Sequence, residues 1–215
     1  MSLKGKNKYL FSYSNKQLEN KKFLYKDFEK SKSYNSKFKE VDFVGTSFRA
    51  AQFKYCTFID CVFEESDFIG TNLRGSRFIN CSFTNCLFQS TNCNKTQFKN
   101  CLYTHCYLDG NKSSVFQSST EFTTINIKEN PINILPELLK EIENLRTNDY
   151  IRRSHTLHSK QKKINYTKLF ILLEEYTQEE LIELLPHISK YIDREFFTIS
   201  YLKKLLKKAL NRVTI

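Results

Sequence analysis

Phenylalanine dominates every fifth position of this chain from residue 38 to residue 108. All 11 phenylalanines between residues 36 and 110 fall in this single phase, a coincidence on the order of one in ten million if each could occupy any of five phases. Chance is therefore excluded. The complete series is Phe38, Phe43, Phe48, Phe53, Phe58, Phe63, Phe68, Leu73, Phe78, Phe83, Phe88, Cys93, Phe98, Tyr103 and Leu108.

A second stripe lies two residues before the first, and every member of it is small. Spacing of two along an extended chain puts both stripes on one face, so large and small side chains point inward together. A period of five fits neither a helix nor a plain strand, so the chain must turn a corner in every repeat. The residues two positions after members of the first stripe include several that are suited to a corner: Gly45, Gly70, Gly75, Asn80, Asn85, Asn100 and Gly110.

Residues 36–108 resemble the pentapeptide-repeat family, whose pattern is a central Leu or Phe with a small residue two positions before it. The resemblance implies a right-handed quadrilateral β-helix, a β-solenoid with four pentapeptides in each coil. We expect between three and four coils, with the aromatic side chains stacked along the axis as the structural core. The expected organisation is a basic N-terminal cap at 1–35, the β-helix at 36–130 and an all-α region at 131–215.

The N-terminal segment keeps the phase of five at Leu18, Phe23 and Phe28, but lysine stands two positions before each of them. A lysine pointing into an apolar core without a partner is costly. We therefore interpret residues 1–35 as a helical or irregular cap that covers the open edge of the first coil.

From Pro136 onward the apolar pattern takes the period of helices, and Thr177 to Glu180 reads as a capping box. The polar stretch from Thr147 to Lys163 is expected to be a linker or loop, and Thr198 to cap a last helix. The apolar strip of that last helix consists of Ile199, Leu202, Leu205, Leu206 and Leu210, with lysines on the opposite side.

Three interpretations of this strip stay open: packing within a small helical domain, dimerisation, and contact with a membrane surface or nucleic acid. In the family that the chain resembles, C-terminal segments often join two rods. We predict a homodimer through the strip, because an end helix would otherwise expose it. Helices between Leu138 and Ile188 could instead cover it within one chain.

The cysteines and histidines offer no catalytic or metal-binding motif. Six of the seven cysteines lie in the small-residue stripe and Cys93 lies in the phenylalanine stripe, so the repeat accounts for their spacing. Cys61, Cys81 and Cys101 would form a line, which cannot surround a tetrahedral zinc ion. We expect no metal, no cofactor, no disulfide and no enzymatic activity.

The formal net charge of +11 is unevenly distributed: residues 36–110 contain 8 Lys/Arg against 7 Asp/Glu. The best-known members of the family have a strongly acidic rod that imitates DNA and protects type II topoisomerases from quinolones, whereas a nearly neutral rod is a poor polyanion. Our first hypothesis is a protein-interaction scaffold. The alternatives are binding of DNA gyrase with quinolone protection, and nucleic-acid binding by the basic helical tail.

The evidence for the scaffold is a set of apolar residues at outward positions of the repeat. The members are Ile59, Ile69, Ile79, Leu87, Leu102 and Tyr107. No apolar run reaches the roughly 18 residues that a membrane helix needs, and the lysine-rich start does not resemble a signal peptide. We expect a cytoplasmic protein without a membrane span.

Overall fold

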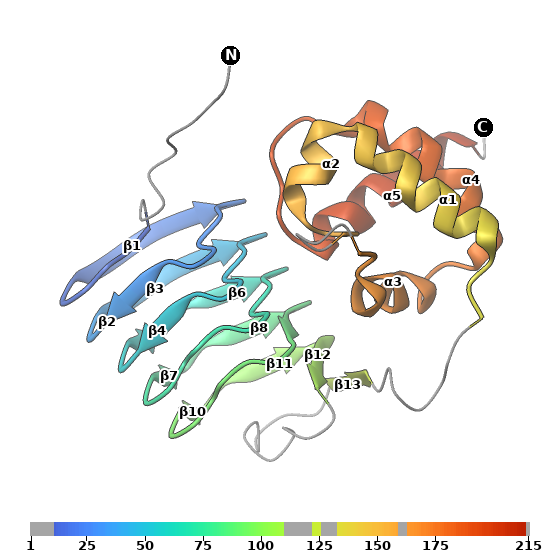
Figure 1. The fold of residues 1–215 in the computed structure, drawn as a ribbon. Helices are drawn as coiled ribbons and strands as arrows, with labels where there is room; N and C mark the ends of the chain where they lie inside the picture. Colours follow the sequence, from blue (N-terminus) through green and yellow to red (C-terminus); the bar gives the residue numbers. More distant parts are fainter. Residues whose placement is uncertain (1–10, 110–121, 126–132, 159–162, 214–215) are drawn as a thin grey trace. The chain divides into compact units, whose positions relative to one another are not determined.

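The computed structural model describes residues 11–109, 122–125, 133–158 and 163–213. The chain divides into two compact units, residues 1–125 and residues 126–215. The first unit is a β-solenoid of about five turns and the second is helical (Figure 1). The predicted fold class is confirmed.

The solenoid consists of short parallel strands that pair with strands twenty residues away, except that Phe122 pairs with Cys106, sixteen residues earlier. Phe38 pairs with Phe58 and Phe58 with Phe78, so four pentapeptides complete one turn. The strands are β1 (Gln17–Leu24), β2 (Lys32–Tyr34), β3 (Lys37–Val44), β4 (Gln52–Lys54), β5 (Thr57–Ile59), β6 (Val62–Glu64), β7 (Arg77–Ile79), β8 (Ser82–Thr84), β9 (Leu87–Phe88), β10 (Gln97–Lys99), β11 (Leu102–Thr104), β12 (Cys106–Asp109) and β13 (Phe122–Ile125).

This register gives the solenoid four faces, which we number in chain order. The first face contains β5, β7 and β10, the second contains β6, β8 and β11, and β1 and β3 run across both. The third face contains β9, β12 and β13, and the fourth contains β2 and β4. Isolated bridges continue the third and fourth faces where strands are too short to be assigned.

Aromatic rings fill the axis of the solenoid in stacked columns. Phe58 stacks on Phe78 with ring centroids 4.6 Å apart and ring planes 3° apart, and Phe63 stacks on Phe83 at 4.8 Å and 5°. The predicted core residues from Phe38 to Phe88 are buried, as are Tyr103 and Leu108, whereas Phe98 is partly buried. The spacing matches the distance between neighbouring strands, so each turn places its rings in contact with the next.

The small residue two positions before each ring has a second role beyond its size. Where this residue is Ser, Thr or Cys, its hydroxyl or thiol donates a hydrogen bond to the backbone carbonyl of the residue 23 positions earlier, in the preceding turn; Val41 and Ala51 have no such donor. Thr71 donates to the oxygen of Phe48 at 2.7 Å, and Ser76 to that of Phe53 at 2.5 Å. Cys86 donates its thiol to the oxygen of Phe63 at 3.3 Å. Small size alone predicts none of these bonds.

Each corner is made by one residue in the left-handed region of backbone conformation. The predicted corner residues within the described range have positive φ, from 53° at Asn80 to 69° at Gly75, while Gly110 lies outside that range. Bulkier residues adopt the same conformation, including Tyr55 at 56° and Lys95 at 56°. Left-handed backbone costs such residues about 1–2 kcal/mol, so the solenoid imposes its geometry on side chains that resist it.

The prediction of a helical or irregular cap at the N-terminus is wrong for the described residues. β1 pairs in register with β3, which aligns Phe23 with Phe43, and Phe28 is fully buried. The lysines that suggested a cap are exposed. The small-stripe side chains of later turns reach toward the preceding turn, whereas those of Lys16, Lys21 and Lys26 do not enter the described core. Lysine is therefore tolerated in the first coil because its side chain meets solvent rather than core.

The second unit contains five α-helices and two 3₁₀ helices within its described residues. Thr177 and Glu180 form the predicted capping box. No helix among the described residues is both long and apolar enough to cross a bilayer. The helices are α1 (Pro136–Asn144), η2 (Leu145–Thr147), α2 (Asp149–Ser154), α3 (Tyr166–Leu173), α4 (Gln178–Leu184), η3 (Leu185–Tyr191) and α5 (Ile199–Val213).

Three expectations for this unit need correction. Residues from Thr147 onward are not all loop, because Asn148 caps α2 through its side chain. His158, placed in the same predicted loop, is buried, and burial lowers its pKa. The hydroxyl of Thr198 has no hydrogen-bond partner in the described part of the chain, so the predicted cap of α5 is absent.

The apolar strip of α5 is covered within the same chain. Ile199 is 3 % exposed and the next three members, Leu202, Leu205 and Leu206, are fully buried, while Leu210 is half-buried. α5 packs against η3 and α4 of its own unit. The reason for expecting a homodimer, an apolar strip with nothing to cover it, is therefore wrong. The strip serves packing inside a helical domain.

We predict that Phe83→Ala lowers the free energy of unfolding by about 3–5 kcal/mol, because it removes a fully buried ring stacked on Phe63 below and Tyr103 above. Urea denaturation of the purified protein measures the effect. Phe98→Ala is the control, since Phe98 is only partly buried and should cost less. A loss below about 1 kcal/mol for Phe83→Ala would show that its column does not hold the turns together.

We also predict that Thr71→Val costs about 1 kcal/mol, because it keeps the shape of the side chain but removes the donor to the Phe48 carbonyl. Val41→Thr makes the reverse change at a stripe position that lacks a donor. The added hydroxyl can donate to the carbonyl of Leu18, 23 residues earlier, so this variant should lose less stability. Equal losses for the two variants, measured by urea denaturation, would mean that the inward hydroxyls contribute nothing beyond their volume.

Candidate interaction faces

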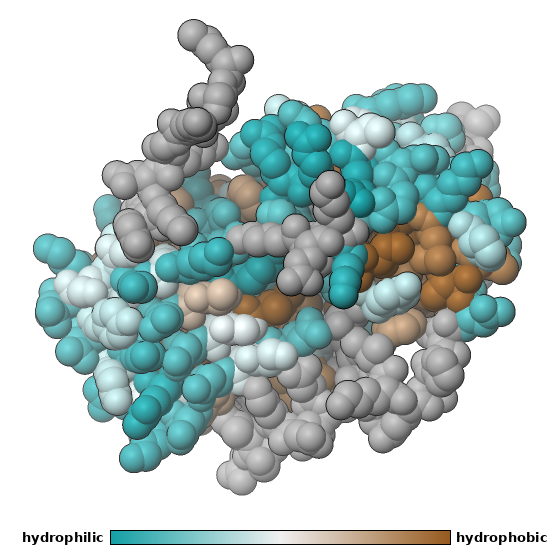
Figure 2. Space-filling view, viewed as in Figure 1, coloured by the Kyte–Doolittle hydropathy of each residue, from teal (hydrophilic) through white to brown (hydrophobic). Residues whose placement is uncertain are grey.

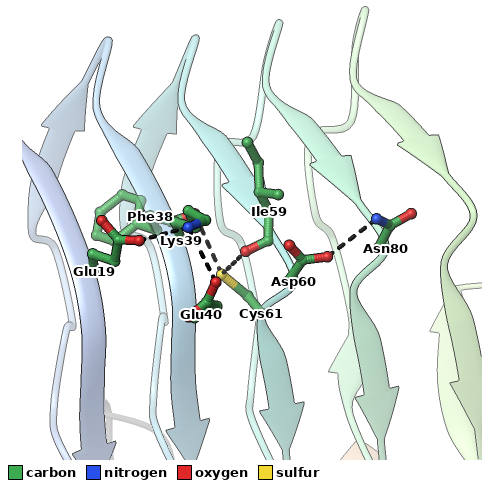
Figure 3. Close-up of polar contacts among 8 residues, drawn as sticks. All are labelled: Glu19, Phe38, Lys39, Glu40, Ile59, Asp60, Cys61 and Asn80. Atoms are coloured by element: carbon green, nitrogen blue, oxygen red, sulfur yellow. Dashed lines mark hydrogen bonds and ion pairs between the residues drawn. The ribbon is translucent and has the colours of Figure 1, made fainter.

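The outward positions flank each ring on either side, and they are where this unit meets its surroundings. On the first face Lys39 donates to Glu19 at 2.6 Å and pairs with Glu40 at 3.1 Å (Figure 3). These contacts raise the pKa of Lys39, chiefly through the hydrogen bond with Glu19. At the corner between the first and second faces Asn80 donates to Asp60 at 3.1 Å. Polar ladders therefore follow this side of the solenoid.

Two of the buried cysteines, Cys56 and Cys86, are held in the thiol form. Burial raises the pKa of the Cys56 thiol to about 11 and that of Cys86 well above its usual range, so these thiols stay protonated and act as donors. All seven cysteines are free and buried. Among the described residues no group of three or more His, Cys, Asp or Glu side chains is placed to hold a metal ion.

The second face carries most of the exposed apolar side chains of the solenoid. Leu24 is 48 % exposed, Val62 38 % and Leu102 61 %. The charges in its first turns partly cancel, because Lys22 pairs with Asp42 at 3.1 Å. Glu64 lies beside Val62 on β6, and the later turns, on β8 and β11, present only uncharged side chains, with Ser82 and Thr84 on β8. Most of the solenoid surface in view in Figure 2 is hydrophilic, so an apolar face is a distinct feature of this unit.

The outward apolar residues that the repeat predicted differ in exposure. Leu102 is largely exposed, whereas Leu87 is 2 % exposed and belongs to no free surface. The remaining four are half-buried: Ile59, Ile69, Ile79 and Tyr107. Leu24 and Val62 were missed, although both occupy outward positions of the repeat and could have been found from their place beside Phe23 and Phe63.

Cations gather at the edge where the fourth face meets the first, and one of them, Lys37, interacts with the charge of Glu19. We call this the basic edge; its cations are Lys37, Lys54, Arg74, Arg77 and Lys95. None of them forms an ion pair with a described residue. Arg77 donates to the hydroxyl of Thr57 at 3.3 Å, and the Lys54 ammonium lies 5.8 Å from the centre of the Tyr34 ring.

Tyr55 lies in the middle of the basic edge and rests on a glycine of the next turn. Tyr55 is 53 % exposed, and a Cβ added at Gly75 would lie 2.5 Å from its ring. Tyr25 lies against Gly45 in the same way. Glycine adopts positive φ at these corners without strain, and the ring that covers it leaves no room for a Cβ atom.

Two family profiles match the solenoid. One, described as a pentapeptide repeat region, covers residues 31–83, and the other, described as pentapeptide repeats in eight copies, covers residues 66–102. The solenoid unit belongs to the pentapeptide-repeat family, as its residues predicted. None of the curated proteins compared with the chain matches it.

Several solved structures share the repeat at low identity. A pentapeptide-repeat protein from the thylakoid lumen of Arabidopsis thaliana is 19% identical, with 46% of this chain and 66% of that chain covered and a TM-score of 0.36. QnrB1, a plasmid-mediated fluoroquinolone resistance protein, is 19% identical, with 46% and 57% covered and a TM-score of 0.27. The chain spans less than two thirds of either. Similarity at this level assigns no function.

We predict that Gly75→Ala displaces the Tyr55 ring and costs more than Gly70→Ala. Both glycines have positive φ, so each substitution carries backbone strain of about 1–2 kcal/mol. Only at Gly75 does the new Cβ also meet a ring, because nothing lies within 4 Å of it at Gly70. Urea denaturation and the Tyr55 ring resonances measure the two effects. Equal costs with an unchanged Tyr55 signal would contradict the packing described.

Proposed function

We propose that the protein is a non-enzymatic scaffold that binds another protein through the second face of its solenoid. The supporting observation is that three of the four exposed large apolar residues of the described solenoid, Leu24, Val62 and Leu102, lie on that one face. Burying apolar area contributes roughly 25 cal/mol per Å², so a flat face of this kind favours a protein partner. A cytoplasmic location belongs to the proposal on the basis of the sequence.

The rigidity of the face supports binding without large reorganisation. β6, β8 and β11 pair in register, with Phe63, Phe83 and Tyr103 stacked beneath them. A partner therefore meets side chains whose backbone is already ordered, which lowers the entropic cost of association. An enzyme would need a pocket, whereas the axis of this solenoid is filled by stacked rings.

The alternative of topoisomerase protection has weaker support. It depends on an acidic rod that replaces DNA, but the first and fourth faces of this rod present lysine and arginine without matching carboxylates along one edge. The alternative of nucleic-acid binding by the helical tail has no specific contact in its favour, and Lys203 of α5 pairs with Glu175 of its own unit.

The test is site-specific photo-crosslinking in the native cell. A photoreactive residue at Leu102 or at Val62 should give a covalent adduct with one defined protein, whereas the same residue at Asn92, on the fourth face, should not. The double substitution Val62→Asp and Leu102→Asp should then abolish co-purification of that protein without changing the melting temperature, because both side chains point outward. Adducts of equal yield from both faces, or co-purification that survives the double substitution, would contradict the proposal.

A further inference from the structure

The basic edge places a cation in each of four successive turns. Lys37 belongs to the first of them, Lys54 to the second, Arg74 and Arg77 to the third, and Lys95 to the fourth. Successive turns are separated by roughly 4.8 Å, so these charges are spread along about 15 Å of the edge. Four of the five side chains are exposed and Lys54 is half-buried.

In the described part of the solenoid no carboxylate occupies a position of this path, although Glu19, farther along the first face, interacts with the charge of Lys37. The outward positions of the fourth face and the adjoining positions of the first are otherwise occupied by uncharged residues. These are Gln17, Tyr34, Asn35, Gln52, Thr57, Asn72, Asn92, Asn94 and Gln97, and the remaining charged member is Lys32. Elsewhere on the solenoid Lys22, Lys30 and Lys39 each pair with an acid. A row of positive charges without negative ones attracts a polyanion, because bound phosphates neutralise the repulsion between the cations.

The aromatic side chain in the row narrows the choice of polyanion. Tyr55 lies between the cations of neighbouring turns, and its position is fixed by contact with Gly75 while more than half of the residue stays exposed. A ring held in this way offers a surface on which a base can stack, a contact worth about 1–3 kcal/mol in proteins that bind single strands. Lipid headgroups have no ring to place there, and an acidic protein would need an aromatic side chain in register with its carboxylates.

We propose that the basic edge binds single-stranded nucleic acid, with the cations contacting phosphates and Tyr55 stacking on a base. The amide side chains of the fourth face supply further hydrogen-bond donors beside the path. This site is separate from the apolar second face, so it adds a partner to the proposed scaffold and does not depend on that proposal. The helical tail takes no part in it.

The experiment measures binding of a fluorescent oligouridylate of about 20 nucleotides to the full chain by anisotropy, at about 0.15 M salt. The variant Lys54→Ala/Arg74→Ala/Lys95→Ala should weaken binding about tenfold or more and reduce the slope of log affinity against log salt by about 2, at roughly 0.7 for each lost phosphate contact. The control Lys22→Ala/Lys39→Ala/Lys99→Ala removes the same charge from other positions and should weaken binding less than about threefold.

A second pair of variants tests the base contact. Tyr55→Ala should weaken oligouridylate binding about fivefold or more and leave the affinity for inorganic polyphosphate unchanged, whereas Tyr55→Phe should behave as the native protein. Gly75→Ala should resemble Tyr55→Ala, because it displaces the ring.

Four outcomes would overturn the proposal. They are no binding of the oligonucleotide, equal losses in the two triple variants, no effect of Tyr55→Ala, and displacement of the oligonucleotide by polyglutamate or by vesicles of phosphatidylserine at matched charge. The last outcome would assign the edge to an acidic protein or to a membrane surface instead. Circular dichroism of each variant separates loss of binding from loss of the β-solenoid.

Discussion

The twenty-residue register is the constraint on which the rest of the solenoid depends. Two contacts enforce it in each turn: a ring stacks on the ring twenty residues away, and a hydroxyl or thiol two positions earlier donates to a carbonyl in the preceding turn. A shift by one residue would move every ring to the outside and leave the donors without acceptors. The register therefore determines which residues face inward, which turn a corner and which face solvent.

The architecture could be predicted because these inward positions recur without a gap, but the direction in which they point could not. The small stripe reaches toward the N-terminal end of the rod, as the bond from Ser36 to the carbonyl of Tyr13 shows. At the first turn the same positions meet solvent, so Lys16, Lys21 and Lys26 fit there. The pattern of large and small residues does not show that the small stripe points toward one end of the rod. Without that direction, those lysines look incompatible with the fold.

In the helical unit, the sequence predicted which face of a helix is buried but not what buries it. The apolar strip of α5 was identified from its period. The elements that cover it, η3 and α4, are separate helices earlier in the sequence. Periodicity within one helix gives the face that must be buried but not the surface that buries it. The same limit applies to exposure on the solenoid, where Leu87 and Val62 occupy equivalent outward positions and only Val62 is exposed.

Because the core occupies the inward positions, the outward ones can vary without altering the register, and different faces can acquire different chemistry. The second and fourth faces lie on opposite sides of a four-sided solenoid, since each turn visits them half a turn apart. A partner on the apolar second face would not compete sterically with a strand along the basic edge. If both sites are occupied together, the rigid solenoid between them holds the two partners at a fixed separation. The columns of stacked rings would then serve as a spacer as well as a core.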